Sequence, residues 1–77
     1  MGIKQRNPVS PETIADVVKK RRKALSMNQA ELALVSGTGV RFISDLENAK
    51  ASCELGKTLN VLTNLGIEVV LKSQPEA

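Results

Sequence analysis

Residues 28–50 of the chain read NQAELALVSGTGVRFISDLENAK, and this stretch decides the fold. Asn28 and Glu31 stand three residues apart, which is the spacing of a helix N-cap and the residue that bonds back to it. Gly37 can adopt the left-handed backbone conformation that ends a helix and turns the chain. We therefore predict a short helix over residues 29–36.

A second short helix is predicted over about residues 40–48, after a turn at Thr38 and Gly39. Its apolar residues Ile43 and Leu46 would face the core. Its outer face would carry Val40, Arg41, Ser44 and Asp45. Two short helices joined by a glycine-containing turn, the second with polar residues outside, have the geometry that places a helix in the major groove of DNA.

Before this stretch, the sequence predicts a longer amphipathic helix. Ser10 supplies a capping hydroxyl, Pro11 suits the first helical position, and Glu12 is an acid in the first turn. The helix is expected to run to about Leu25. One apolar stripe comprises Ile14, Val17, Val18 and Leu25.

After this stretch, Ser52 is predicted to cap a fourth helix that ends before Gly66. Leucines recur along its inner face at Leu55, Leu59, Leu62 and Leu65. The run that follows favours β-structure and contains Ile67, Val69, Val70 and Leu71. A lone strand cannot satisfy its own backbone groups, so we expect residues 67–71 to pair with a second copy of the chain.

The expected fold is therefore all-α: a compact four-helix helix-turn-helix domain with a short C-terminal β-strand that pairs across a dimer. Residues 1–9 would form a flexible arm, residues 10–72 the folded domain, and residues 73–77 a flexible tail. The chain has 77 residues, enough for one domain and one modest core. Phe42 is its one aromatic residue, so the core must be aliphatic.

Positive charge is concentrated in the first part of the chain. Residues 1–52 carry nine basic and five acidic side chains, whereas residues 53–77 carry two and three. Five basic residues are consecutive, at positions 19–23. A basic block on a helix is either a nucleic-acid footprint or a solvated helix face, and composition alone leaves both open.

Several classes of function are excluded by composition. Cys53 is the only cysteine and there is no histidine, so neither an intramolecular disulfide nor a zinc-finger ligand set can form. We expect Cys53 to be a small residue near the start of the fourth helix rather than a nucleophile or a redox sensor. Catalytic motifs are absent, and no cofactor, metal or small-molecule ligand is expected.

The sequence contains no apolar stretch of the roughly 20 residues that span a bilayer. Residues 1–10 have no hydrophobic signal core. The expected location is the cytoplasm, without contact with a membrane.

Residues 22–50 resemble the XRE, or Cro/CI, family of phage-type repressors, whose fold is that of lambda repressor. The motifs are MNQAELA and SGTGVRFISDLENAK. The Asn-Gln-x-x-Leu-Ala run, the glycine of the turn and the Ile-Ser-x-Leu-Glu-Asn-x-Lys ending fit the family pattern together. The resemblance implies binding to double-stranded operator DNA.

Carried over from the family, base contacts would come from Val40, Arg41, Ser44 and Asp45. Arg41 could pair bidentately with guanine, a contact worth about 1–3 kcal/mol of discrimination, although a phosphate contact competes. Phosphate contacts would come from Asn28, Gln29, Thr38, Asn48 and Lys50, with Asn28 also acting as a helix cap. The family also implies a buried structural ion pair between Arg22 and Glu47.

Three positions leave alternatives open. Asp45 could accept from cytosine, organise Arg41, or repel phosphates. Gly39 departs from the polar N-cap common in the family, so either Thr38 caps the recognition helix or the helix begins loosely. Phe42 replaces a small polar residue, and we favour its partial burial over contact with thymine.

More narrowly, the chain resembles HipB-like antitoxins, one-domain repressors whose short terminal strand pairs with that of the dimer mate. This resemblance implies a second partner, a HipA-like kinase toxin. A dimer is also expected because one short helix reads only a few base pairs. The alternatives are a stand-alone phage-type repressor and a module that binds a protein without specific DNA binding.

Overall fold

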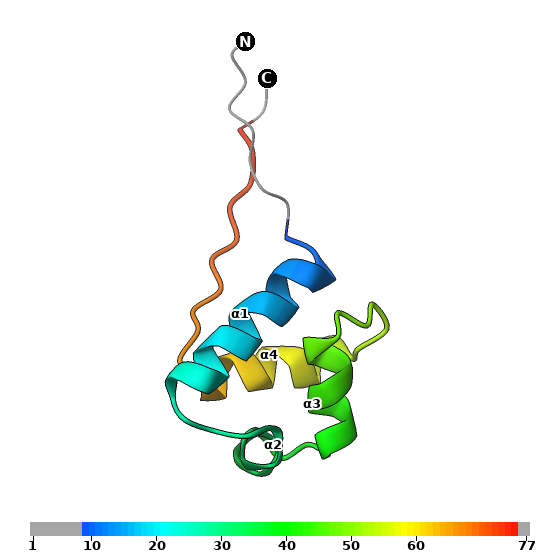
Figure 1. Ribbon diagram of the computed structural model, residues 1–77. Coiled ribbons are helices and arrows are strands. Elements are labelled where there is room, and N and C mark those ends of the chain that lie inside the picture. The colour runs from blue at the N-terminus through cyan, green and yellow to red at the C-terminus, as the bar shows by residue number, and fades with distance from the viewer. Residues whose placement is uncertain (1–8, 76–77) are drawn as a thin grey trace.

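A computed structural model describes residues 9–75, in which the chain forms four α-helices (Figure 1). Their bounds are Pro11–Ala24 for α1, Gln29–Ser36 for α2, Val40–Glu47 for α3 and Leu55–Asn64 for α4. Helix α3 packs against α1 and α2, and α2 also packs against α4. The prediction of an all-α four-helix domain is confirmed.

Helices α1 and α2 begin where their capping residues predict. Ser10 accepts a hydrogen bond from the Thr13 backbone, and Asn28 and Glu31 form a reciprocal capping box. Helix α4, however, is capped by Glu54, whose carboxylate accepts from the backbone nitrogens of residues 56 and 57 at 2.9 and 3.0 Å. The prediction of a Ser52 cap was wrong, because the chain turns into the helix two residues later.

The core lies where the four helices meet and is aliphatic. Its fully buried side chains are Val18, Leu32, Ile43, Val61 and Leu65. Phe42 is half-buried against this core, as we favoured, and the Lys57 ammonium lies 5.9 Å from its ring centre. Other apolar residues expected in the core are partly exposed instead: Val17, Leu25, Leu55 and Leu59.

The predicted C-terminal strand is absent from the described part of the chain. Residues 67–71 are extended without a β-ladder, and Figure 1 shows this segment leaving the end of α4 and running past α1. Ile67 packs against the core, whereas Leu71 is 88% exposed. A ladder needs a second strand, and residues 9–75 supply none.

Most of the predicted N-terminal arm, residues 1–8, lies outside the described residues, as do residues 76–77. Across residues 9–75, no helix combines the length and the apolar character needed to cross a membrane.

Candidate DNA interface

The turn between α2 and α3 brings the two helices close together. Gly37 has a φ angle of 70°, and the Thr38 backbone nitrogen donates to the carbonyl of Ala33 at 2.9 Å. Ala33 is buried and presents only a methyl group between the helices. The left-handed glycine and the small residue together set the angle at which α3 leaves the turn.

Helix α3 begins without a side-chain cap, so of the two alternatives, a Thr38 cap and a loose start, the structure shows the second. Its N-cap is Gly39, and no side chain bonds to the first turn. The Thr38 hydroxyl donates instead to the Gly39 carbonyl at 3.3 Å. The first backbone N–H groups of α3 therefore have no side-chain cap, and they can donate to an anion.

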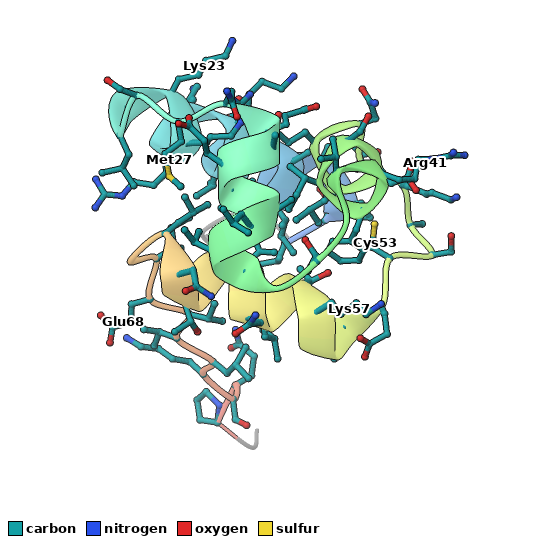
Figure 2. All side chains as sticks on the ribbon, turned by 90° about the horizontal axis from the view of Figure 1, so that it is seen from below. Lys23, Met27, Arg41, Cys53, Lys57 and Glu68 are labelled. Carbon is teal, nitrogen blue, oxygen red and sulfur yellow. The ribbon has the colours of Figure 1, made fainter. Side chains whose placement is uncertain are left out.

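The outer face of α3 presents the residues expected to contact bases. The Arg41 side chain is 86% exposed and points away from the helices in Figure 2. Its Nε atom lies 3.5 Å from Oδ1 of Asp45. Val40 is exposed, whereas Ser44 and Asp45 are half-buried.

Two of the residues expected to contact phosphate, Asn48 and Lys50, lie at the end of α3. Lys50 lies beyond the helix with its ammonium 3.6 Å from Oδ2 of Asp45. Asn48 is the C-cap, and its amide lies 3.5 Å from the Ser44 hydroxyl. The structure thus gathers Asp45, Lys50 and Asn48 at one end of the outer face.

The start of α2 is joined to the end of α3. Asn28 caps the helix through its side chain, and Gln29 donates from Nε2 to Oε1 of Glu47 at 3.0 Å. An amide nitrogen carries two hydrogens, so the second one stays available for a further acceptor. The Gln29 bond has no signal in the sequence, because its partner is on another helix.

Beneath the face, Arg22 and Glu47 form a bidentate ion pair between α1 and α3. The two bonds measure 2.6 Å from Nε and 2.9 Å from Nη2. A third bond runs from Arg22 Nη1 to the carbonyl of Met27 at 2.8 Å. The side chains are only 10% and 2% exposed, so the pair is part of the core.

Burial by itself raises the pKa of the Glu47 carboxyl, but opposing interactions outweigh it. Hydrogen bonds from Arg22 and Gln29, and the positive charges of Arg22 and Lys19, leave the pKa below its ordinary value. The bond to Glu47 in turn raises the pKa of Arg22. Both groups are therefore charged at neutral pH.

The basic run at 19–23 does not act as one block. Lys20 pairs with Asp16 at 3.2 Å, and Arg21 donates to the carbonyl of Leu65 at 2.8 Å, where α4 ends. Arg22 is buried in its ion pair. Lys19 and Lys23 are exposed, and Lys23 points into solvent in Figure 2.

Cys53 is half-buried next to the core, between the end of α3 and the start of α4. Burial raises the pKa of its thiol, the charge of Asp45 raises it further, and Lys50 opposes the shift. The thiol is therefore protonated at neutral pH, which does not suit a nucleophile.

An apolar groove lies along α1 and α4. It has a volume of about 470 Å³ and is bordered by α1, α4 and the extended C-terminal segment. Three residues expected in the core, Val17, Leu55 and Leu59, line it together with Val69, Val70 and Leu71. Their partial exposure follows from this position, because no described part of the chain covers the groove.

The comparisons with known proteins agree with this geometry. Residues 18–53 match the model of a helix-turn-helix family. The HTH-type transcriptional regulator y4mF of Sinorhizobium fredii (strain NBRC 101917 / NGR234) is 43% identical over 60 residues, which cover 78% of this chain and 79% of that protein.

Solved structures of HipB are similar to the whole described fold. The chain matches one in a HipA–HipB–O2–O3 complex with a TM-score of 0.77 and 25% identity, covering 92% of this chain and 100% of that one. One in a HipB–O1–O2 complex gives a TM-score of 0.78 and 26% identity, covering 90% and 100%.

Proposed function

Because the chain belongs to the helix-turn-helix family of XRE-type transcriptional regulators, we propose that it is a sequence-specific repressor that binds a palindromic operator as a homodimer. As a member of this family it is a transcriptional regulator and not an enzyme. The observation that carries the proposal is the α2–turn–α3 unit. Its second helix, α3, presents the exposed Arg41 on the face that points away from the core.

In the proposed complex, α3 lies in the major groove. Arg41 donates its fork to a guanine, while Val40 and Ser44 lie against neighbouring base edges. Phosphates are bound by Asn28, Gln29, Thr38, Asn48 and Lys50. Gln29 would donate to a phosphate through the amide hydrogen that is not bonded to Glu47. Glu47 therefore positions a phosphate ligand in addition to its role in the buried ion pair.

The homodimer is supported by the apolar groove and the extended segment that borders it. Val69 and Val70 are 49% and 63% exposed, and residues 67–71 have no ladder partner among the described residues. In the proposed dimer, Ile67, Val69, Val70 and Leu71 of two copies pair as strands and cover both grooves. A two-fold dimer would place the two α3 helices about 34 Å apart, one turn of DNA.

We further propose an antitoxin role, which includes binding of a HipA-like kinase toxin. Its support is the similarity to HipB chains, one of them solved in a HipA–HipB–O2–O3 complex. Self-repression would follow if the operator lies in the promoter of the chain's own operon.

Fluorescence anisotropy tests DNA binding directly. The purified protein is titrated into labelled DNA from its own promoter and into a scrambled duplex, at two salt concentrations. We expect preference for the promoter and steep weakening at higher salt, because phosphate contacts release counterions. Arg41→Ala should reduce the preference and leave thermal unfolding unchanged. Equal binding of both duplexes would overturn the repressor proposal and favour a module that binds only protein.

A further inference from the structure

Asp45 places a negative charge on the face that the proposed function directs toward DNA. The surrounding phosphates repel such a charge, so its presence needs a physical reason. The two carboxylate oxygens face different cations. Oδ1 lies 3.5 Å from Nε of Arg41, and Oδ2 lies 3.6 Å from Nζ of Lys50.

The atom through which Arg41 meets Asp45 decides what the arginine can still do. A guanidinium donates through Nε and through two terminal nitrogens in a fixed plane. Because Asp45 is paired with Nε, both terminal nitrogens stay free. They form the fork that matches O6 and N7 of guanine. The Arg41 side chain is 86% exposed, so this fork is accessible.

The second oxygen ties Asp45 to the phosphate-binding end of the face. The Lys50 backbone nitrogen also donates to the Asp45 carbonyl, at 3.0 Å. Backbone and side chain of Asp45 therefore both contact Lys50. One residue thus fixes the position of a base ligand relative to that of a phosphate ligand.

We infer that Asp45 is a positioning residue that gives Arg41 its selectivity for guanine, and that it does not read a base itself. This inference rests on the proposed DNA binding. In a complex with the wrong sequence, Arg41 would turn to a phosphate and no longer pair with Asp45. The Asp45 carboxylate would then lie near the DNA phosphates with only Lys50 to offset its charge. The carboxylate therefore penalises nonspecific complexes more than the specific one.

Selection from a random-sequence duplex library tests the inference. The wild-type protein should enrich a palindrome with one strongly preferred guanine in each half-site. Asp45→Asn should lower the preference at that guanine by at least about fivefold, the lower end of what an arginine–guanine pair contributes. Preferences at other positions should hold. Asp16→Asn makes the same charge change at the exposed pair on α1 and should behave as wild type.

A double variant distinguishes a role of Asp45 in positioning Arg41 from direct contact between Asp45 and a base. Because Asp45 acts through Arg41, adding Asp45→Asn to the Arg41→Ala variant should cause no further change in the selected sequence. An equal change in both backgrounds, or the loss of a cytosine preference, would mean that Asp45 reads a base and would overturn the inference. So would an unchanged guanine preference in Asp45→Asn.

A second measurement excludes a merely structural effect. Asp45→Asn should bind scrambled DNA more tightly than wild type does, because a repulsive charge is gone, whereas a poorly folded variant would bind all DNA less well. Asp45→Ser also lacks the charge and should likewise bind scrambled DNA more tightly than wild type. Weaker binding of scrambled DNA by both variants would contradict the inference. If the wild-type protein enriches no sequence, the proposed function itself fails, and the role of Asp45 fails with it.

Discussion

Gln29 donates a hydrogen bond to Glu47, with 3.0 Å between its Nε2 atom and the carboxylate Oε1. Glu47 also receives both bonds of the Arg22 fork, so one buried carboxylate joins α1, α2 and α3. The start of α2, which carries two of the proposed phosphate ligands, is thereby connected to the core. Damage to this cluster should affect folding before it affects recognition.

Replacement of Arg22 by Ala should lower the free energy of unfolding by about 3–5 kcal/mol, because Glu47 would keep a buried charge without its partner. Urea unfolding followed by circular dichroism measures the loss. Lys20→Ala is the matched control, since it removes an exposed ion pair on the same helix and should cost less than about 1 kcal/mol. Similar losses for the two variants would contradict the structural role of Arg22.

Acid should weaken the fold through Glu47. The pKa of Glu47 is lower in the folded chain than its ordinary value of 4.5, so its stabilisation is present above that value and is lost as the pH falls through the folded pKa. Wild type should therefore be more stable than Glu47→Gln at pH 7, and the difference should shrink below about pH 4. Urea unfolding of both proteins across this pH range measures the difference in the free energy of unfolding. A difference that does not change with pH would show that Glu47 does not cause the acid sensitivity.

Glu54, not Ser52, should determine the stability of the start of α4. Glu54→Ala removes two hydrogen bonds to the first turn and should cost about 1 kcal/mol. Ser52→Ala should change the free energy of unfolding by less than about 0.5 kcal/mol. Thermal unfolding of the two variants distinguishes the residues, and a larger loss for Ser52→Ala would restore it as the cap.

The features that the sequence predicts correctly depend on neighbours within one turn of a helix. The Asn28–Glu31 capping box and the left-handed Gly37 are of this kind, and so is the outer position of Arg41. Capping preference alone was insufficient at α4, because Ser52 has the favoured side chain but Glu54 has the required position.

The features that the sequence does not predict join distant segments. Arg21 donates to Leu65, 44 residues away, and Asn60 donates to the carbonyl of Ser36, 24 residues away. No local spacing encodes such pairs. Periodicity placed Val17 and Leu59 on apolar faces, but it could not show that these faces border an open groove.

Ser36→Ala should stabilise the protein. Within residues 9–75, the buried Ser36 hydroxyl has no hydrogen-bond partner, which costs about 1–3 kcal/mol, and alanine is also the better helix former. We expect a gain of about 1 kcal/mol in urea unfolding. Asn60→Ala should have the opposite effect, because it leaves the Ser36 carbonyl without its 2.6 Å bond. A loss of stability in Ser36→Ala would show that the hydroxyl is satisfied in solution.

Val69→Asp should convert the proposed dimer into monomers, because it places a charge in the apolar groove and between the pairing strands. Light scattering after size exclusion gives the mass, and anisotropy should show weaker operator binding, since a monomer reaches one half-site. Leu34→Asp is the matched control, because Leu34 lies on α2 away from the groove and is 82% exposed. It should remain dimeric. A Val69→Asp protein of wild-type mass would place the dimer contact elsewhere, whereas loss of mass in both variants would mean that α2 takes part in it.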